Sequence, residues 1–193
     1  TTVTLPSGLQ TIGNGAFSGD TALTSIAVPS TVTAIGSSAF YNNSNLTSVT
    51  FPGVSQLTSI GAYAFQGAGL TSFSMPNSVT TLGLKAFFQA VHLASITLST
   101  SLTTIPVDTF YQDGALTGTL TIPNSVSTIG IRAFRYTGLT GVVLGANLRE
   151  IGDGAFEDTP VAGPIVLPPL VQTVGFGAFD QTSITSVTLN EGL

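Results

Sequence analysis

The sequence has very little charge and no cysteine. Of its 193 residues, 4 are Lys or Arg and 9 are Asp or Glu, which gives a formal net charge of −5. A nucleic-acid surface needs several clustered cations to neutralise phosphates, so we predict no nucleic-acid partner. The absence of cysteine excludes disulfides, thiolate metal sites and cysteine nucleophiles, and it leaves the redox compartment open.

Long hydrophobic runs are also lacking, although the mean hydropathy of +0.48 is high. Ser, Thr, Gly and Pro interrupt every apolar stretch before it reaches the roughly 18 residues of a membrane helix, so we predict no membrane-spanning segment. Residues 1–6 have neither the basic region nor the apolar core of a signal peptide. The pattern described next starts and stops in mid-unit, which predicts a fragment of a longer protein.

A repeat of about 23 residues is the main feature that the sequence does contain. Its most regular position is a phenylalanine, here called the repeat phenylalanine, with successive spacings of 23, 25, 22, 23, 24, 22 and 23. These residues are Phe17, Phe40, Phe65, Phe87, Phe110, Phe134, Phe156 and Phe179. Seven of them follow an alanine, and seven lie four residues after a glycine, Pro106 being the exception. One unit cannot bury its apolar residues alone, so the pattern predicts stacked units with a continuous core.

Each unit has the pattern of a short strand followed by turns. In the second unit, residues 23–28 carry a strand signal, and Pro29 ends the strand because proline cannot donate to a ladder. Gly36 predicts a turn that a side chain would obstruct. Residues 37–42 are long enough for one helical or 3₁₀ turn.

Two units depart from the regular pattern. The spacing of 25 between Phe40 and Phe65 predicts an insertion near residues 52–56. Four prolines surround residues 165–167, which predicts a shortened or bulged strand there. Neither departure predicts a second domain, and we expect residues 1–193 to form a single domain.

The motif L-x-x-I-x-L-P-x-x-L-x-x-I-G-x-x-A-F resembles the BspA-like class of leucine-rich repeat and covers essentially the whole chain. The resemblance implies a right-handed leucine-rich-repeat solenoid of about eight repeats with a parallel β-sheet on its concave side. To this we add short helical or 3₁₀ turns on the convex side. The resemblance also implies an extracellular or cell-surface location and roles in adhesion. The family often has cysteine shortly after the phenylalanine, where this chain has residues such as Gly19, Asn43 and Ala68.

The outward positions of the expected concave strands form two columns of small hydroxyl side chains. The nine candidate binding residues are Ser25, Ser48, Thr50, Ser72, Ser74, Ser95, Thr97, Thr119 and Thr121. Three interpretations stay open: β-compatible filler on an exposed sheet, an adhesive or packing surface for a protein or a second copy, and an ice-binding lattice of hydroxyls and methyls.

Charge and glycosylation motifs are unevenly distributed. Before Asp108 the only charged residues are Asp20 and Lys85, so we expect the amino-terminal half to pack against a partner or to be shielded by glycan, unless its Ser, Thr and Asn side chains suffice to solvate it. Asn42 and Asn45 both satisfy the glycosylation pattern, which matters only in a eukaryotic secretory protein.

Residues that could support catalysis or metal binding are scarce. His92, the single histidine, is predicted in a loop, and no nucleophile elbow is present. Glu150, Asp153, Glu157 and Asp158 could ligate calcium or act as paired carboxylates, but neighbouring arginines favour a solvated face with ion pairs. We therefore expect no enzyme activity, no cofactor and no metal.

The sequence favours a non-catalytic surface or extracellular scaffold for adhesion or assembly through protein–protein contacts. The alternatives are a receptor-like binder of a protein or extracellular glycan on the concave face, ice binding by the Thr/Ser ladder, and a module that positions a larger enzyme.

Overall fold

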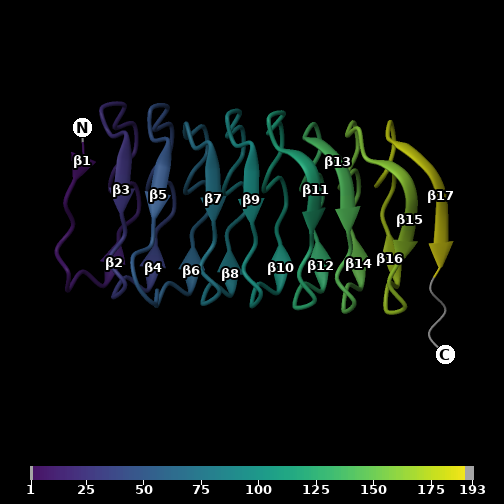
Figure 1. The fold of residues 1–193 in the computed structure, drawn as a ribbon, viewed down its shortest axis with the longest axis horizontal. Helices are drawn as coiled ribbons and strands as arrows, with labels where there is room; N and C mark the ends of the chain where they lie inside the picture. The colour runs from purple at the N-terminus through teal and green to yellow at the C-terminus, as the bar shows by residue number, and fades with distance from the viewer. Residues whose placement is uncertain (1, 190–193) are drawn as a thin grey trace.

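The computed structural model describes residues 2–189 and is a coiled stack with two rows of parallel strands along its length (Figure 1). Each row is divided into shorter hydrogen-bonded sheets, and we call the two rows the odd-strand sheet and the even-strand sheet. Each coil contributes one strand to each sheet. The odd-strand sheet contains β1 (Thr2–Val3), β3 (Ser25–Ala27), β5 (Ser48–Thr50), β7 (Ser72–Ser74), β9 (Ser95–Thr97), β11 (Thr117–Thr121), β13 (Gly138–Val143), β15 (Ala162–Leu167) and β17 (Ser183–Leu189). The even-strand sheet contains β2 (Thr11–Ile12), β4 (Ala34–Ile35), β6 (Ser59–Ile60), β8 (Thr81–Leu82), β10 (Thr104–Ile105), β12 (Thr128–Ile129), β14 (Glu150–Ile151) and β16 (Thr173–Val174). The predicted solenoid of about eight repeats is confirmed.

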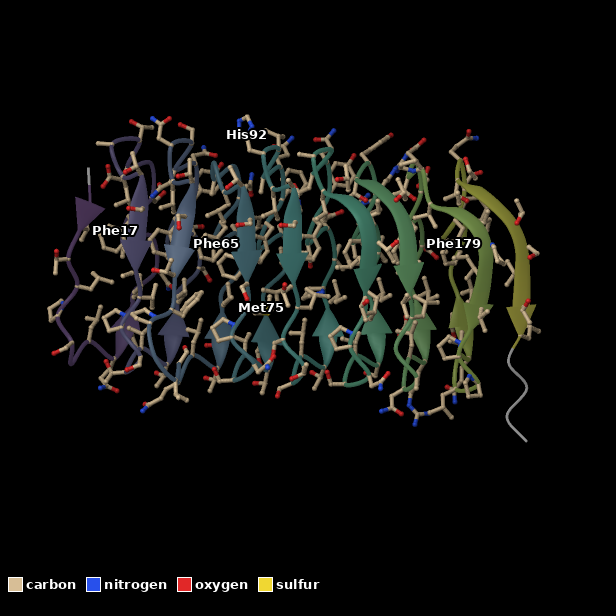
Figure 2. The ribbon with its side chains drawn as sticks, in the orientation of Figure 1. Phe17, Phe65, Met75, His92 and Phe179 are labelled. Atoms are coloured by element: carbon tan, nitrogen blue, oxygen red, sulfur yellow. The ribbon has the colours of Figure 1, made fainter. Side chains whose placement is uncertain are left out.

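The repeat phenylalanines form a continuous ring stack through the core. Their successive centroids lie 5.5, 5.2, 5.3, 5.4, 5.2, 5.1 and 5.2 Å apart, and the ring planes deviate from parallel by 4–16°. The six inner rings have 0% exposure, whereas Phe17 and Phe179 at the two ends are partly buried (Figure 2). Parallel aromatic rings at these distances add to the stabilisation from apolar burial.

The predicted helical turns are wrong, because residues 2–189 contain no helix. In every coil the residues two before and two after the repeat phenylalanine have positive φ, between 52° and 72°. A left-handed residue cannot continue a right-handed helix. The amide of the repeat phenylalanine instead donates to the next coil, as from Phe17 N to Ala39 O at 2.8 Å and from Phe40 N to Ala64 O at 2.8 Å. We call this segment, from four residues before to three residues after each repeat phenylalanine, the turn ladder.

The glycine four residues before the repeat phenylalanine makes room for the preceding coil. A Cβ on Gly36 would lie 2.6 Å from Asn14 N, and a Cβ on Gly130 would lie 2.7 Å from the carbonyl carbon of Pro106. Neither glycine has a positive φ. The glycine is therefore required by backbone-to-backbone packing between coils, not by a left-handed turn.

Pro106 occupies this glycine position in the fifth coil and explains a break in the even-strand sheet. In other coils the glycine amide donates to the preceding coil, as from Gly83 N to Ile60 O and from Gly130 N to Ile105 O. Proline has no N–H to donate. Accordingly, the even-strand sheet divides into β2-β4-β6-β8 and β10-β12-β14-β16, although β8 and β10 remain adjacent.

Both irregular units lie where the sequence placed them. Nine positions separate the end of β5 from the start of β6, against seven between β3 and β4, and the extra residues include Gly53 at φ 77° and Val54 at 90% exposure. The pairing of the proline-rich strand β15 shifts register between Gly163 and Pro164, where its partner β17 carries one extra residue, Thr185. The sequence also allowed a shortened strand at this place. That alternative is wrong, because β15 has six residues.

We predict that Phe110→Ala lowers the free energy of unfolding by about 3–5 kcal/mol, because it removes one fully buried ring from the stack. Phe176→Ala is the matched control, since that ring is 91% exposed. Urea unfolding curves of both variants measure the difference. Equal midpoints for the two variants would contradict a stabilising role for the stack.

We also predict that Gly130→Ala destabilises the protein by about 1–3 kcal/mol, because the added methyl overlaps backbone atoms of the preceding coil. Gly13 holds the same position in the first coil, and a Cβ there has no atom within 4 Å. Gly13→Ala should therefore be close to neutral in thermal unfolding. A Gly130→Ala protein as stable as Gly13→Ala would rule out the packing explanation.

Candidate functional site

The outer face of the odd-strand sheet brings the nine predicted binding residues together. The registers pair Ser25 with Ser48 and Ser72 with Ser95, and in the second column they pair Ser74 with Thr97. Ser25 and Ser48 are partly buried, whereas Thr50, Ser72, Ser74, Ser95, Thr97, Thr119 and Thr121 are exposed. The two columns predicted from the sequence therefore exist as neighbouring rows of short side chains.

Both hydroxyl columns end between β11 and β13. Thr119 pairs with Gly141, and Thr121 pairs with Val143. Val143 and Val166 are 53% and 55% exposed and help to line a shallow groove of about 380 Å³. A regular lattice of hydroxyls thus covers only the middle of the stack, and an apolar surface follows it.

The two glycosylation candidates lie in the exposed loop between β4 and β5. Asn42 has a φ of 55°, the left-handed conformation of the turn ladder. The Asn45 side-chain nitrogen, to which a glycan would be attached, donates to Thr21 O at 2.8 Å. Glycosylation of Asn45 would have to displace this hydrogen bond.

The four acidic residues of the last coils make different contacts. Glu157 and Asp158 form ion pairs, and Asp153 accepts a backbone hydrogen bond. Arg135 Nη2 lies 2.7 Å from Glu157 Oε1 and 3.2 Å from Asp158 Oδ2. Asp153 Oδ1 accepts a hydrogen bond from Phe176 N at 2.8 Å, and Glu150 is exposed on β14. Among residues 2–189, no three His, Cys, Asp or Glu side chains are grouped so as to hold a metal ion.

His92 is exposed in the loop before β9, at the edge of the stack where the coils connect (Figure 2). This position agrees with the loop predicted from the sequence. The part of the chain that the structure describes contains no helix long and apolar enough to cross a membrane.

Aromatic and charged side chains of the turn ladder form a cluster, of which the sequence predicted only the ion pairs between arginines and the acidic group. We call it the turn-face network; its members are Tyr63, Lys85, Phe88, Asp108, Tyr111, Arg132, Arg135, Tyr136, Glu157 and Asp158. It includes three of the four tyrosines and three of the four basic residues in the chain. Its members stand at the positions two before, one after and two after the repeat phenylalanine, so the repeat spacing itself carries the signal for this cluster.

Ion pairs and ring contacts connect this network from coil to coil. Arg132 binds Asp108 through two hydrogen bonds of 2.8 and 3.0 Å, and Lys85 Nζ lies 3.9 Å from the same carboxylate. The hydrogen bond to Asp108 raises the pKa of the Arg132 guanidinium above its ordinary value. The rings of Phe88 and Tyr111 stack at 5.2 Å with planes 5° apart. The network therefore holds its side chains in a fixed arrangement.

Asp113 is a buried carboxyl three residues after Phe110. Its side chain has 0% exposure, and neither carboxylate oxygen has a geometrically acceptable hydrogen-bond partner. Burial raises the pKa of Asp113 well above its ordinary value of 3.8. The backbone amide of Ala90 lowers this pKa, but by less than burial raises it.

Later coils satisfy this position with threonine. Thr137 Oγ1 donates to Phe134 O at 2.8 Å, and Thr159 Oγ1 donates to Phe156 O at 2.6 Å. The buried carboxyl of Asp113 thus stands where the three later coils have a neutral, hydrogen-bonded threonine, and we interpret it as a local destabilising feature of the core.

The geometry defines the class of the protein: a leucine-rich-repeat solenoid with a filled core. The sequence matches the BspA type leucine-rich repeat region in six copies, over residues 1–117, 54–162 and 109–193. The chain belongs to this family, and the resemblance noted from its repeat motif is confirmed. No curated protein matches the sequence.

Solved structures of bacterial proteins share the fold. The pneumococcal vaccine antigen PcpA is 21% identical with a TM-score of 0.67, over 95% of this chain and 57% of that chain. A leucine-rich repeat protein from Bacteroides ovatus is 22% identical with a TM-score of 0.58, over 97% of this chain and 68% of that chain. A leucine-rich repeat protein from T. pallidum is 25% identical with a TM-score of 0.57, over 96% of this chain and 72% of that chain.

We predict that Asp113→Thr stabilises the protein at pH 7 by about 1–3 kcal/mol, because it replaces an unsatisfied buried carboxyl with a residue that can donate to Phe110 O. In the wild type, the folded state keeps the Asp113 proton above pH 3.8 while the unfolded state loses it, so this residue's contribution falls as pH rises through that window.

The gain from Asp113→Thr should therefore shrink on acidification and be smallest below about pH 3.8. Denaturant unfolding of wild type and variant across the pH range measures this difference. The reverse exchange in the neighbouring coil, Thr137→Asp, should destabilise the protein at pH 7. A gain independent of pH would contradict the raised pKa.

Proposed function

We propose that the chain is a non-catalytic scaffold, extracellular or on a cell surface, that makes protein–protein contacts for adhesion or assembly through the odd-strand sheet. One observation carries the proposal. Seven exposed Ser and Thr side chains form two adjacent columns on β5, β7, β9 and β11, without a charged side chain in those columns. Such an uncharged face can approach another protein surface without desolvating a charge.

The chemistry of these side chains supports a protein contact. Ser and Thr lose little side-chain entropy when they are buried, and their hydroxyls can donate or accept hydrogen bonds. The core beneath them is filled, since Phe65 and Phe87 have 0% exposure, so the face is a surface and not the mouth of a deep pocket.

Family membership supports the surface location. The chain carries the BspA type repeat along its length, and the pneumococcal protein with the same fold is a vaccine antigen. Because this chain spans 57% of that chain, any activity or partner of a longer protein is part of the proposal.

The experiment compares two double variants that differ only in the sheet they charge. Thr97→Lys with Thr121→Lys places two cations on β9 and β11 of the odd-strand sheet. Thr81→Lys with Thr104→Lys places two on β8 and β10 of the even-strand sheet, and all four threonines are exposed. Sedimentation velocity from micromolar to millimolar concentration measures association.

We expect wild type and the even-strand variant to self-associate, and we expect the odd-strand variant to remain monomeric because like charges face each other across the contact. A wild-type protein that is monomeric at millimolar concentration would overturn assembly. Glycan-array binding that only the odd-strand variant loses would then favour the alternative of a glycan receptor on the same face.

A further inference from the structure

Three consecutive coils carry an exposed apolar side chain at the position three before the repeat phenylalanine. Leu84, Val107 and Ile131 are 44%, 38% and 42% exposed. The backbone links their coils, since Lys85 N donates to Val107 O at 3.1 Å and Asp108 N donates to Ile131 O at 3.0 Å. We call these three residues the apolar stripe.

The stripe lies in a shallow groove of about 490 Å³ beside the even-strand sheet. Pro106, Gly130 and Gly152 also line the groove, and the two glycines project no side chain into it. Thr104, Thr128 and Glu150, on strands β10, β12 and β14, add polar side chains to its lining. The groove therefore has an apolar centre with a polar border, which is the anatomy of a protein–protein contact.

The border on the turn-ladder side carries an outward excess of positive charge. Lys85 and Arg132 directly follow Leu84 and Ile131, and their side chains are 32% and 45% exposed. The carboxylate that they share, Asp108, is only 4% exposed and lies beneath them. A partner on this border meets Lys85 and Arg132 above one largely covered carboxylate, while the exposed carboxylate of Glu150 lies on the strand side of the groove.

Ring contacts hold these cations in place. Lys85 Nζ lies 5.0 Å from the ring centre of Phe88, and Arg132 Cζ lies 5.9 Å from that of Tyr111. Because the two rings also stack on each other, these contacts occupy the ring faces that a stacked sugar would need. The cluster is thus preorganised for charge recognition and poorly suited to carbohydrate stacking.

We propose that the apolar stripe and its cationic border dock an amphipathic α-helix of a partner protein, lying along the solenoid axis. The helix places apolar side chains on Leu84, Val107 and Ile131, and it places carboxylates toward Lys85 and Arg132. This surface lies on a different side of the coil from the odd-strand columns, so the proposal does not depend on them.

The coil spacing favours a helix over an extended segment. Parallel strands repeat about every 4.8 Å, so three coils span about 9.6 Å. Helix residues i, i+4 and i+7 share a face and span about 10.5 Å, close to that length. Same-side residues of an extended chain repeat about every 6.6 Å and lose register with the coils after one step.

The probe is a display library built on one fixed helical scaffold, randomised over its exposed face and selected against the whole chain. We expect enriched helices with apolar residues at i, i+4 and i+7 and with Asp or Glu along one flank. Val107→Ser with Ile131→Ser should weaken binding at least about tenfold, as for central contact residues. Val143→Ser, an exposed valine on the other sheet, is the matched control and should bind like the wild type.

Arg132→Gln is a second variant that leaves the apolar stripe intact. It should weaken the same helices and reduce the salt dependence of their binding, because it removes a border cation. Circular dichroism and thermal unfolding check that each variant is folded. A library without enriched binders, binders without the acidic flank, or binding that is equal in wild type and the Val107→Ser, Ile131→Ser protein would each overturn the proposal.

Discussion

Backbone hydrogen bonding between neighbouring coils is the constraint on which the rest of the structure depends. The two sheets and the turn ladder all donate across the same step, for example from Gly36 N to Ile12 O at 2.8 Å and from Phe40 N to Ala64 O at 2.8 Å. Because this step is set by strand pairing, every side chain at a given repeat position meets its own counterpart about 4.8 Å away. The phenylalanine stack, with centroids 5.1–5.5 Å apart, is a consequence of that spacing.

This constraint explains at which positions of the repeat the residue type can change. The glycine at the first position of the turn ladder has a backbone neighbour where its side chain would be, as Gly130 shows, so most coils retain it. Proline is accepted there at Pro106, and one hydrogen bond of the even-strand sheet is lost with it. The left-handed positions of the ladder are less strict: Gly15 and Lys85 hold the same position at φ 62° and 56°. Because the inter-coil bonds fix the backbone there, residues with a conformational cost of about 1–2 kcal/mol are tolerated.

The fold and the strand columns could be predicted from the sequence because both follow from periodicity. The repeat phenylalanines mark the period, and the insertion near Gly53 and the register shift near Pro164 coincide with local departures from it in spacing or composition. The turn ladder could not be predicted in the same way, since a stretch such as residues 37–42 is equally compatible with a helical turn, and only the inter-coil bonds decide between them. Of the candidate site, the exposure of Thr97 and Thr121 followed from strand alternation. The pairing of Arg132 with Asp108, 24 residues apart, depends on the ladder geometry and was not visible in the strand pattern.

A solenoid of this kind makes surfaces by changing one column over a few coils. The odd-strand column changes from Thr121 to Val143 in one step, and a hydroxyl surface becomes an apolar one. On the turn ladder, the position before the repeat alanine or threonine changes from Tyr63 to Lys85 to Asp108 to Arg132, which builds a charged network without altering the core. Recognition and stability therefore use different positions of the same repeat. A substitution in an outward column can alter a partner contact while the phenylalanine stack and the inter-coil bonds stay as they are, so one family of coils can present many different faces.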